Sequence, residues 1–199
     1  MHAGLVHGLK VGFFSLEMAK EQLMMRMLSA KSKINFSKIR TGFLSDTEFQ
    51  KTVDAAESLQ RANIFIDDTP ALTSLDLRSR TRRLKSDKGL DILVVDYLQL
   101  MRGNSRTDNR EREIAEISLS LKALAKELQI PIIAISQLSR QTEARTDKKP
   151  QLSDLRESGA LEQDADMVIF LHRADAYKRI ADERDGLAEV IIGKQRNGP

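Results

Sequence analysis

An aspartate ends one of the most apolar runs in the sequence, at a position where α/β enzymes place their chemistry. Residues 91–97 read Asp-Ile-Leu-Val-Val-Asp-Tyr. This pattern is typical of a buried parallel strand that delivers its last side chain, Asp96, to the carboxyl edge of a sheet. A carboxylate there could hold a magnesium ion or orient water beside a nucleotide phosphate. The alternative is that Asp96 only caps a turn or the next helix.

Glu17 and Gln137 follow two further apolar runs that read as strands. Glu17 comes just after residues 11–15 and could polarise an attacking water, or it could be a dipole partner at the start of the next helix. Gln137 comes just after residues 132–136, where an amide could sense a γ-phosphate and signal to the following loop, or could be a plain turn residue. If the strands are parallel, Gln137 lies at the same edge as Asp96.

Two cations, Lys194 and Arg196, fall in a tight turn at the end of the last predicted strand. An arginine presented on such a turn could reach the nucleotide of a neighbouring subunit, a role worth about 10³ to 10⁵ in rate. The alternative is a pair of solvated turn residues.

Cations also gather in one loop and on one predicted helix. Flexible loop cations flanking Gly159 could approach a nucleic-acid backbone, and because no aromatic residue lies among them, backbone contact is favoured over base stacking. The loop cations are Arg140, Arg145, Lys148, Lys149 and Arg156. The helix cations are Arg78, Arg80, Arg82, Arg83 and Lys85. We interpret the helix group as a solvated face with few acids nearby.

Size and composition fit one α/β domain with its own core. The chain has 199 residues, 41% hydrophobic and 31% charged, with a net charge of +3. This mild excess permits nucleic-acid binding without arguing for it. With no cysteine and three scattered histidines, neither a disulfide framework nor a Cys/His metal site is expected. No run is apolar enough to cross a bilayer, so we expect a cytoplasmic protein with no membrane partner.

Strand-like runs alternate with segments of helical period, which predicts an α/β fold with a mostly parallel sheet and helices on both faces. The predicted strands are 11–15, 64–67, 92–96, 132–136, 167–171 and 189–194. A capping box of Ser45 with Glu48 predicts a helix, in which Phe49, Val53, Ala56 and Leu59 share one face. Ser74 is expected to cap the next helix and Gly89 to end it. The longest helix is predicted over 110–128, with a buried stripe made of Ile114, Ile117, Leu121, Leu124 and Leu128.

Both ends of the domain are expected to be truncated. Residues His2, Leu5, Val6 and Leu9 have helical spacing with no start signal before them, and the chain stops at Gly198 and Pro199 directly after a predicted strand. The phosphate-loop pattern G-x-x-x-x-G-K-[ST] occurs nowhere in the sequence. We therefore expect nothing in these 199 residues to cradle β- and γ-phosphates.

Several segments together resemble the DnaB family of bacterial replicative DNA helicases, and the resemblance extends over essentially every residue. They occur in the order that the family has. The segments are Ser15–Met18, Asp96–Leu100, Ile135–Arg140, Asp154–Gly159 with Glu162–Asp166, and Lys194–Gly198.

The resemblance implies a RecA-like P-loop NTPase fold. It also implies that copies of the protein assemble as a homo-hexameric ring around single-stranded DNA, and that the ring moves along the DNA by hydrolysing ATP with Mg²⁺. It implies that Glu17 is the catalytic base, that Asp96 organises magnesium, and that Gln137 couples the γ-phosphate to DNA. Lys194 and Arg196 would be the cations offered to the adjacent subunit's nucleotide.

The resemblance also implies partners. Arg156, Glu157 and Gly159 match the loop that the family lays along the DNA backbone, and Arg140 is a further DNA-binding candidate. Primase and a helicase loader are expected partners of the full-length protein.

The chain departs from the family because it lacks the phosphate loop and the amino-terminal primase-interacting domain. Residues 1–199 are therefore predicted to be part of a RecA-like C-terminal ATPase domain that does not hydrolyse ATP alone. A RecA- or RadA-type recombination ATPase shares the fold, but Glu162–Asp166 and the Lys-Gln-Arg-Asn-Gly turn favour the helicase family. A third hypothesis is a non-catalytic module that binds DNA or joins a ring.

Overall fold

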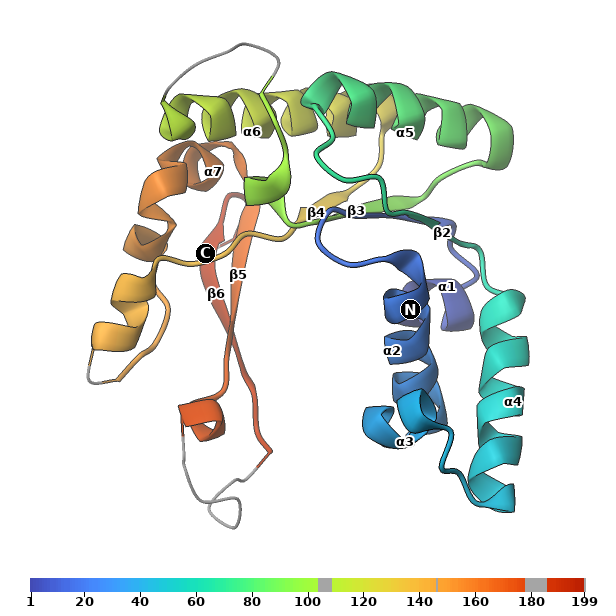
Figure 1. Ribbon diagram of the computed structural model, residues 1–199. Helices are drawn as coiled ribbons and strands as arrows, with labels where there is room; N and C mark the ends of the chain where they lie inside the picture. The colour runs from blue at the N-terminus through green and yellow to red at the C-terminus, as the bar shows by residue number, and fades with distance from the viewer. Residues whose placement is uncertain (104–108, 146, 178–185, 199) are drawn as a thin grey trace. The chain divides into compact units, whose positions relative to one another are not determined.

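The computed structural model describes residues 1–103, 109–145, 147–177 and 186–198 (Figure 1). Within these ranges, the side chains of Arg140, of residues 156–158 and of residues 176–177 also lie outside the description. The chain divides into two compact units. Unit 1 comprises Met1–Arg102 and Leu124–Ile135, and unit 2 comprises Gly103–Ala123 and Ser136–Pro199.

Unit 1 is built on a four-stranded parallel sheet. Its strands, in the order β2-β1-β3-β4, are β1 (Val11–Ser15), β2 (Ile64–Asp67), β3 (Ile92–Asp96) and β4 (Ile132–Ala134). Parallel pairing brings Ser15 level with Asp96 and Phe14 level with Asp67. Every strand therefore ends at the same edge, where the side chains that follow the strands gather.

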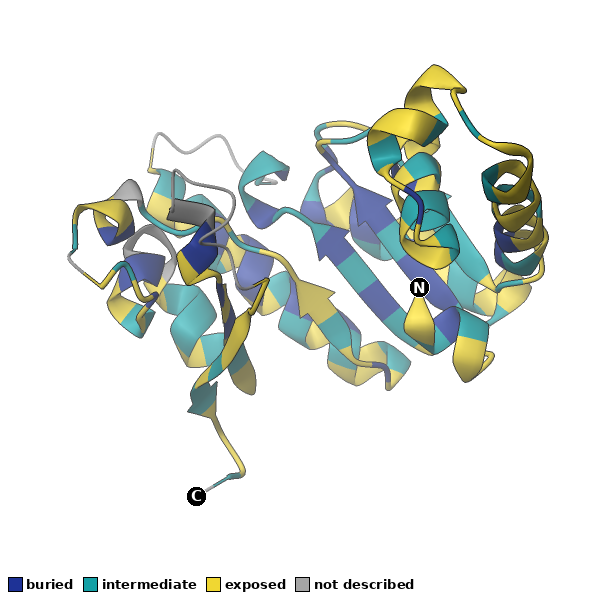
Figure 2. Cartoon of the chain, turned by 90° about the horizontal axis from the view of Figure 1, so that it is seen from below, coloured by how far each residue is buried: buried dark blue, intermediate teal, exposed yellow. Residues whose placement is uncertain are grey.

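Helices cover both faces of this sheet, as predicted. The helices of unit 1 are α1 (His2–Val6), α2 (Lys20–Ser32), α3 (Phe36–Thr41), α4 (Asp46–Gln60) and α5 (Ser74–Lys88), with a short 3-10 turn η1 (Leu98–Leu100). In Figure 1, α5 lies on one face, while α1, α2 and α4 lie on the other. Packing under α5 is close, because a Cβ added to Gly12 would lie only 3.1 Å from Leu90 and 3.2 Å from Leu84. Figure 2 shows buried residues on the two central strands, β1 and β3, between these layers.

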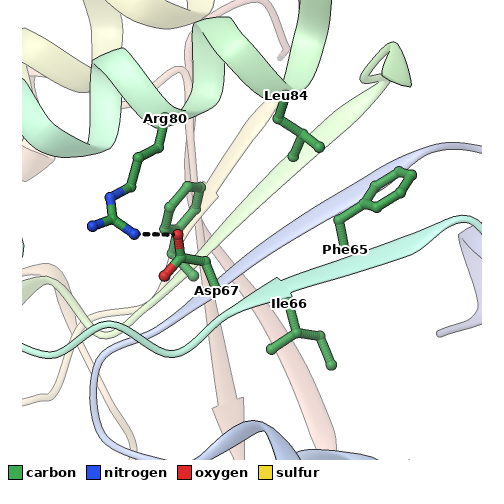
Figure 3. Close-up of a pocket in the computed structure, with 6 residues that line it drawn as sticks. Phe65, Ile66, Asp67, Arg80 and Leu84 are labelled. Atoms are coloured by element: carbon green, nitrogen blue, oxygen red, sulfur yellow. Dashed lines mark hydrogen bonds and ion pairs between the residues drawn. The ribbon is translucent and has the colours of Figure 1, made fainter. Parts of the chain in front are cut away.

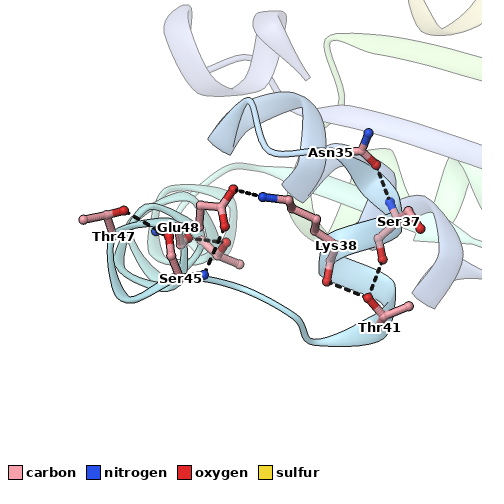
Figure 4. A network of polar contacts seen from close by, with 8 residues as sticks. Asn35, Ser37, Lys38, Thr41, Ser45, Thr47 and Glu48 are labelled. Atoms are coloured by element: carbon pink, nitrogen blue, oxygen red, sulfur yellow. Dashed lines mark hydrogen bonds and ion pairs between the residues drawn. The ribbon is translucent and has the colours of Figure 1, made fainter.

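Local capping fixes where two helices begin. Ser45 and Glu48 form the predicted capping box at α4, and Lys38 joins α3 to α4 through a 2.7 Å ion pair with Glu48 (Figure 4). At α5 the cap is Thr73, paired with Asp76, so the prediction of Ser74 was wrong by one residue. Gly89 ends α5 as predicted, with φ of 78°.

The residues predicted to share one face of α4 are only partly buried. Ala55 and Leu59 are buried, whereas Phe49 is 60% exposed and Ala56 is also exposed. The helical period was correct, but the face is decided by the helix against which α4 packs, which is α2. Sequence period alone does not name that neighbour.

Unit 2 contains an antiparallel ribbon and short helices. Its elements after α6 (Arg110–Leu128) are η2 (Arg140–Ala144), η3 (Leu152–Ser158), α7 (Gly159–Asp164), β5 (Met167–His172), η4 (Ala174–Tyr177) and β6 (Glu189–Gln195). β5 pairs only with β6 among the described strands. Phe170 and His172 are buried on one side of this ribbon, while its other side exposes Met167, Ile169, Leu171, Val190 and Ile192.

The α/β prediction is therefore confirmed, and parallel pairing holds for four of the six predicted strands. The last two strands form a separate antiparallel pair, because period-two alternation specifies a strand but not its direction. The bounds of α6 agree with the predicted helix, and four residues of its predicted stripe are buried. No helix in the described ranges is both long enough and apolar enough to cross a membrane.

Candidate functional site

Glu17 and Asp96 lie together at the carboxyl edge of the sheet in unit 1. Ser15 is level with Asp96 across the β1–β3 pair, and the backbone N–H of Leu16 donates to the Asp96 carbonyl at 2.7 Å. This register places Glu17, one residue further on, close enough for its charge to act on Asp96. The structure thus brings together two of the acidic residues that the sequence predicted to share a site.

The turn that presents Glu17 is held by a buried serine. The Ser15 hydroxyl donates to the Met18 carbonyl at 2.7 Å and accepts from the Met18 N–H at 3.2 Å. Ser15 is only 1% exposed, so this local loop has a fixed base. Glu17 itself is exposed.

Glu17 does not serve the α2 terminus. The helix begins at Lys20, three residues later, and its cap residue Ala19 makes no side-chain hydrogen bond. The backbone N–H of Lys20 donates instead to the Asp68 carboxylate at 3.0 Å. Asp68 therefore supplies the acidic hydrogen-bond partner at this terminus.

The ionised form of Asp96 is disfavoured by its surroundings. Burial, and then the nearby charge of Glu17, raise the pKa of the Asp96 carboxyl above its ordinary value. Within the described part of the chain, neither carboxylate has a hydrogen-bond or ion-pair partner. Two unpaired acids that repel each other are suited to a divalent cation or to a water that must lose a proton.

The described residues contain no group of three or more acidic, histidine or cysteine side chains that could hold a metal ion. Mg²⁺ usually keeps several waters and is bound through one or two carboxylates together with substrate phosphates. The donor set of Asp96 with Glu17 fits that requirement. It does not fit a metal site built from protein ligands alone.

A second acidic pair, Asp67 and Asp68, follows β2 at the same edge, but it is engaged in structural contacts. Asp67 accepts from Arg80 Nη1 at 2.8 Å and from the Thr69 N–H at 3.0 Å. Burial would raise the pKa of Asp67, but hydrogen bonds from Thr69 and Arg80 outweigh it and the pKa is lowered. The Asp67–Arg80 pair lines a hollow of about 200 Å³ (Figure 3).

That hollow is mainly apolar and does not include the Glu17–Asp96 pair. Its other lining residues are Phe14, Phe65, Ile66 and Leu84.

Gln137 follows β4 in the chain. The backbone of Ile135, two residues earlier, donates to the Val95 carbonyl and accepts from the Leu98 N–H, both at 2.9 Å. The chain therefore runs beside the end of β3 until unit 1 finishes at Ile135. Gln137 belongs to unit 2 and is exposed, and its coupling role stays a prediction.

Lys194 and Arg196 are held by the C-terminal end of α7. Lys194 Nζ donates to the carbonyls of Glu162 and Gln163. Arg196 donates through Nη2 to the Gln163 carbonyl at 2.7 Å and through Nη1 to Asp166 at 3.2 Å. Cations are favoured at a helix C-terminus, where the last carbonyls lack helical partners. These two residues are therefore not simply solvated turn residues.

Two of the loop cations proposed for nucleic acid have internal acidic partners. Arg145 donates to both carboxylate oxygens of Asp154, with Nη1 at 3.0 Å, and Asp154 is 5% exposed. Lys149 forms a 2.8 Å ion pair with Glu189. Arg145 is thus placed to hold the loop together, and both cations have acidic partners that the sequence did not indicate.

The remaining DNA candidates are only partly described. The backbones of Arg140, Arg156 and Glu157 lie in η2 and η3, but their side chains lie outside the described part of the structure. Gly159 begins α7 and has open space around its Cα, since an added Cβ would meet nothing within 4 Å.

The arginines of α5 are paired, contrary to the prediction that few acids lie near them. Arg78 and Arg82 both contact Glu127 at the end of α6, at 2.7 and 2.5 Å. Arg80 contacts Asp67. The sequence did not reveal Glu127 as a partner, because it lies 49 residues from Arg78 and 45 residues from Arg82.

Comparison with known proteins gives a consistent result. The family model of the DnaB-like helicase C terminal domain matches residues 1–199. The chain is 54% identical over 200 residues to the replicative DNA helicase DnaB of Buchnera aphidicola subsp. Schizaphis graminum, covering 100% of this chain and 43% of that protein. It is 52% identical over 190 residues to the DnaB of Geobacillus stearothermophilus, covering 95% and 42%. The chain thus spans less than half the length of these relatives.

Solved structures agree on the fold. A DnaB-like replicative helicase, described with its interactions with primase, matches with a TM-score of 0.89 at 41% identity, over 97% of this chain and 48% of that one. A structure described as an ATPase domain gives the same score and identity over 97% and 69%. The RadB recombinase, at a TM-score of 0.54 and 17% identity over 98% and 74%, shares the fold alone.

Proposed function

The chain belongs to the DnaB-like helicase C-terminal domain family, and from that premise we propose that residues 1–199 are part of the ATPase domain of a replicative DNA helicase. In this function ATP hydrolysis drives movement along single-stranded DNA and unwinding at the fork. The observation that carries the proposal is the unpaired Glu17–Asp96 pair at the carboxyl edge of a parallel sheet.

Each acid of the pair has a separate proposed role. Bound Mg²⁺ would supply charge neutralisation for the ATP phosphates, with Asp96 orienting it through water. Glu17, exposed beside it on the turn fixed by Ser15, would accept the proton of the attacking water. A cation next to Asp96 would also offset the repulsion that raises its pKa.

Gln137, Lys194 and Arg196 complete the proposed catalytic set. Gln137 would report the γ-phosphate to the loop that follows it. Lys194 and Arg196 would act on the nucleotide of the adjacent subunit in a homo-hexameric ring. Their shared contacts with α7 support this role because they hold two cations together at one end of β6.

Single-stranded DNA is the proposed polymeric substrate. Arg140, Arg156, Glu157 and Gly159 would line its backbone; Arg156, Glu157 and Gly159 lie together in η3 and at the start of α7, and Arg140 lies in η2. Primase and a helicase loader are proposed partners of the longer protein, in a cytoplasmic setting. Primase is a partner named for one of the solved relatives.

The test is ATP hydrolysis stimulated by single-stranded DNA, measured on two proteins. One is this chain, and the other, called here the extended chain, carries an added upstream segment with a phosphate loop. We expect hydrolysis only in the extended chain, because the 199 residues contain no phosphate-loop motif. If neither protein hydrolyses ATP while both bind DNA, the catalytic proposal fails and a DNA-binding module is the better description.

A further inference from the structure

Asp166 makes contact with two cations that come from distant parts of unit 2. It follows α7 and precedes β5. Its carboxylate contacts Lys122 Nζ on α6 at 2.5 Å and Arg196 Nη1 at 3.2 Å. Its backbone carbonyl also accepts from the Arg196 N–H at 2.7 Å. Arg196 is therefore attached to Asp166 through both its backbone and its side chain.

The support for these cations is anchored on α6. Ser118 is 5% exposed and donates to the Asp164 carboxylate at 2.6 Å, which fixes the end of α7. The carbonyls of Glu162 and Gln163 at that end accept from Lys194 and Arg196. Residues 162–166 thus form a set of carbonyl and carboxylate acceptors, which we call the α7 cradle.

The α7 cradle leaves donor capacity on both cations. A lysine ammonium has three N–H groups and an arginine guanidinium has five. In the described contacts, Lys194 uses its ammonium toward two carbonyls, and the Arg196 guanidinium makes two hydrogen bonds. Each cation is therefore held in place while N–H groups stay available for a phosphate.

Ordering the two cations in advance matters because long cationic side chains lose rotamer freedom when they are ordered. A cation that is already ordered stabilises a developing charge without that loss at the moment of reaction. An exposed ion pair by itself contributes little to stability, and the Asp166 side chain is 64% exposed. The Asp166–Arg196 ion pair is thus better explained by the positioning of Arg196 than by a contribution to folding stability.

We propose that Asp166 is a positioning residue which, together with the carbonyls at the end of α7, orders Lys194 and Arg196 for the nucleotide of the adjacent subunit. Lys122 fixes Asp166 to α6 and sets where the α7 cradle lies. This inference rests on the proposed function for the role of the two cations, but the ordering itself is a property of unit 2.

The first experiment measures ordering in this 199-residue chain. The ¹⁵N relaxation of the Arg196 Nε–H group reports the motion of the guanidinium. We expect a rigid group in the parent and a mobile one in Asp166→Asn, because the variant keeps the shape and loses the charge. The matched control is Glu189→Gln, which removes the same charge from the Lys149 ion pair at the other end of β6. Equal mobility in parent and Asp166→Asn overturns the inference whether or not the protein hydrolyses ATP.

The second experiment measures hydrolysis in the extended chain. Asp166→Asn is expected to lower kcat about 10- to 100-fold with little change in KM for ATP, and Asp166→Glu to recover part of the loss. In an Arg196→Ala background, Asp166→Asn should cause little further loss. A full additional loss in that background, or an equal loss in Glu189→Gln, would show a structural role instead. A parent that hydrolyses no ATP contradicts the proposed function and leaves the relaxation result to decide the ordering.

Discussion

Two pairs of carboxylates follow neighbouring strands at one edge of the same sheet, and their surroundings are opposite. Asp67 and Asp68 have protein partners: an arginine, a threonine and the start of a helix. Glu17 and Asp96 have none among the described residues. Accordingly the pKa of Asp67 is lowered, whereas that of Asp96 is raised.

The difference separates acids that stabilise the fold from acids that are available to a ligand. A carboxylate with partners contributes stability and has little capacity left for a phosphate-bound cation. A carboxylate without partners, held near a like charge, is unfavourable in the free protein and gains when a ligand arrives. Both pairs lie where strands of this sheet end. Their hydrogen-bond and ion-pair partners, rather than their position, therefore distinguish structural acids from acids available to a ligand.

The largest expected effect is on hydrolysis by Glu17→Gln in the extended chain. A glutamine has the same shape but cannot accept a proton, so kcat should fall about 10²- to 10⁴-fold. The melting temperature should not fall, because Glu17 has no partner among the described residues to lose and its repulsion of Asp96 is removed. Steady-state kinetics and thermal unfolding check the two expectations. A variant with near-parental kcat would remove Glu17 from the catalytic set.

For Asp67→Asn we expect the opposite result: a loss of stability with hydrolysis nearly unchanged. This substitution weakens the contacts with Arg80 and Thr69, and we expect unfolding free energy to fall by about 1 kcal/mol, since the pair is partly exposed. Hydrolysis by the extended chain should stay within about twofold of the parent, because a stability role does not require a kinetic one. Urea unfolding and kcat measure the two quantities. A large loss of kcat with intact stability would end the distinction between the two pairs.

Much of this arrangement could be predicted from local sequence. The bounds of α6 and the four parallel strands follow from hydrophobic period, and parallel strands necessarily end at one edge. That reasoning puts Glu17 and Asp96 each at the carboxyl end of a strand. It needs no knowledge of distant residues, because β1 and β3 each carry their own signal.

Partners could not be predicted in the same way. The ion pairs of Arg78 and Arg82 with Glu127, and of Arg145 with Asp154, depend on which elements pack together. Sequence shows the charges but not those neighbours, so the arginines of α5 looked solvated and Arg145 looked flexible. The exposed Phe49 has the same origin, since the neighbour of α4 decides which face is buried.

The pH dependence of stability should show the contribution of Asp67. Its folded pKa is lowered from an ordinary value of 3.8, so the unfolded chain binds protons first as pH falls. The stabilisation is therefore full well above pH 3.8 and is lost as pH falls through the lowered pKa. The difference in unfolding free energy between parent and Asp67→Asn should be largest near neutral pH and should shrink in acid. A difference that is independent of pH would show that the Asp67 charge is not its source.

The smallest expected effect on stability has the opposite sign, and it belongs to Asp96. The folded pKa of Asp96 is raised from 3.8 by burial and by Glu17, so the folded state holds this proton more tightly than the unfolded chain. Its ionisation therefore destabilises the fold increasingly as pH rises through the raised pKa. Removing the charge in Asp96→Asn should increase the melting temperature at neutral pH by about 1 to 2 °C, with no gain in acid, while hydrolysis by the extended chain is lost. Loss of both stability and hydrolysis would instead make Asp96 a structural acid like Asp67, and the contrast between the two pairs would then rest on Glu17 alone.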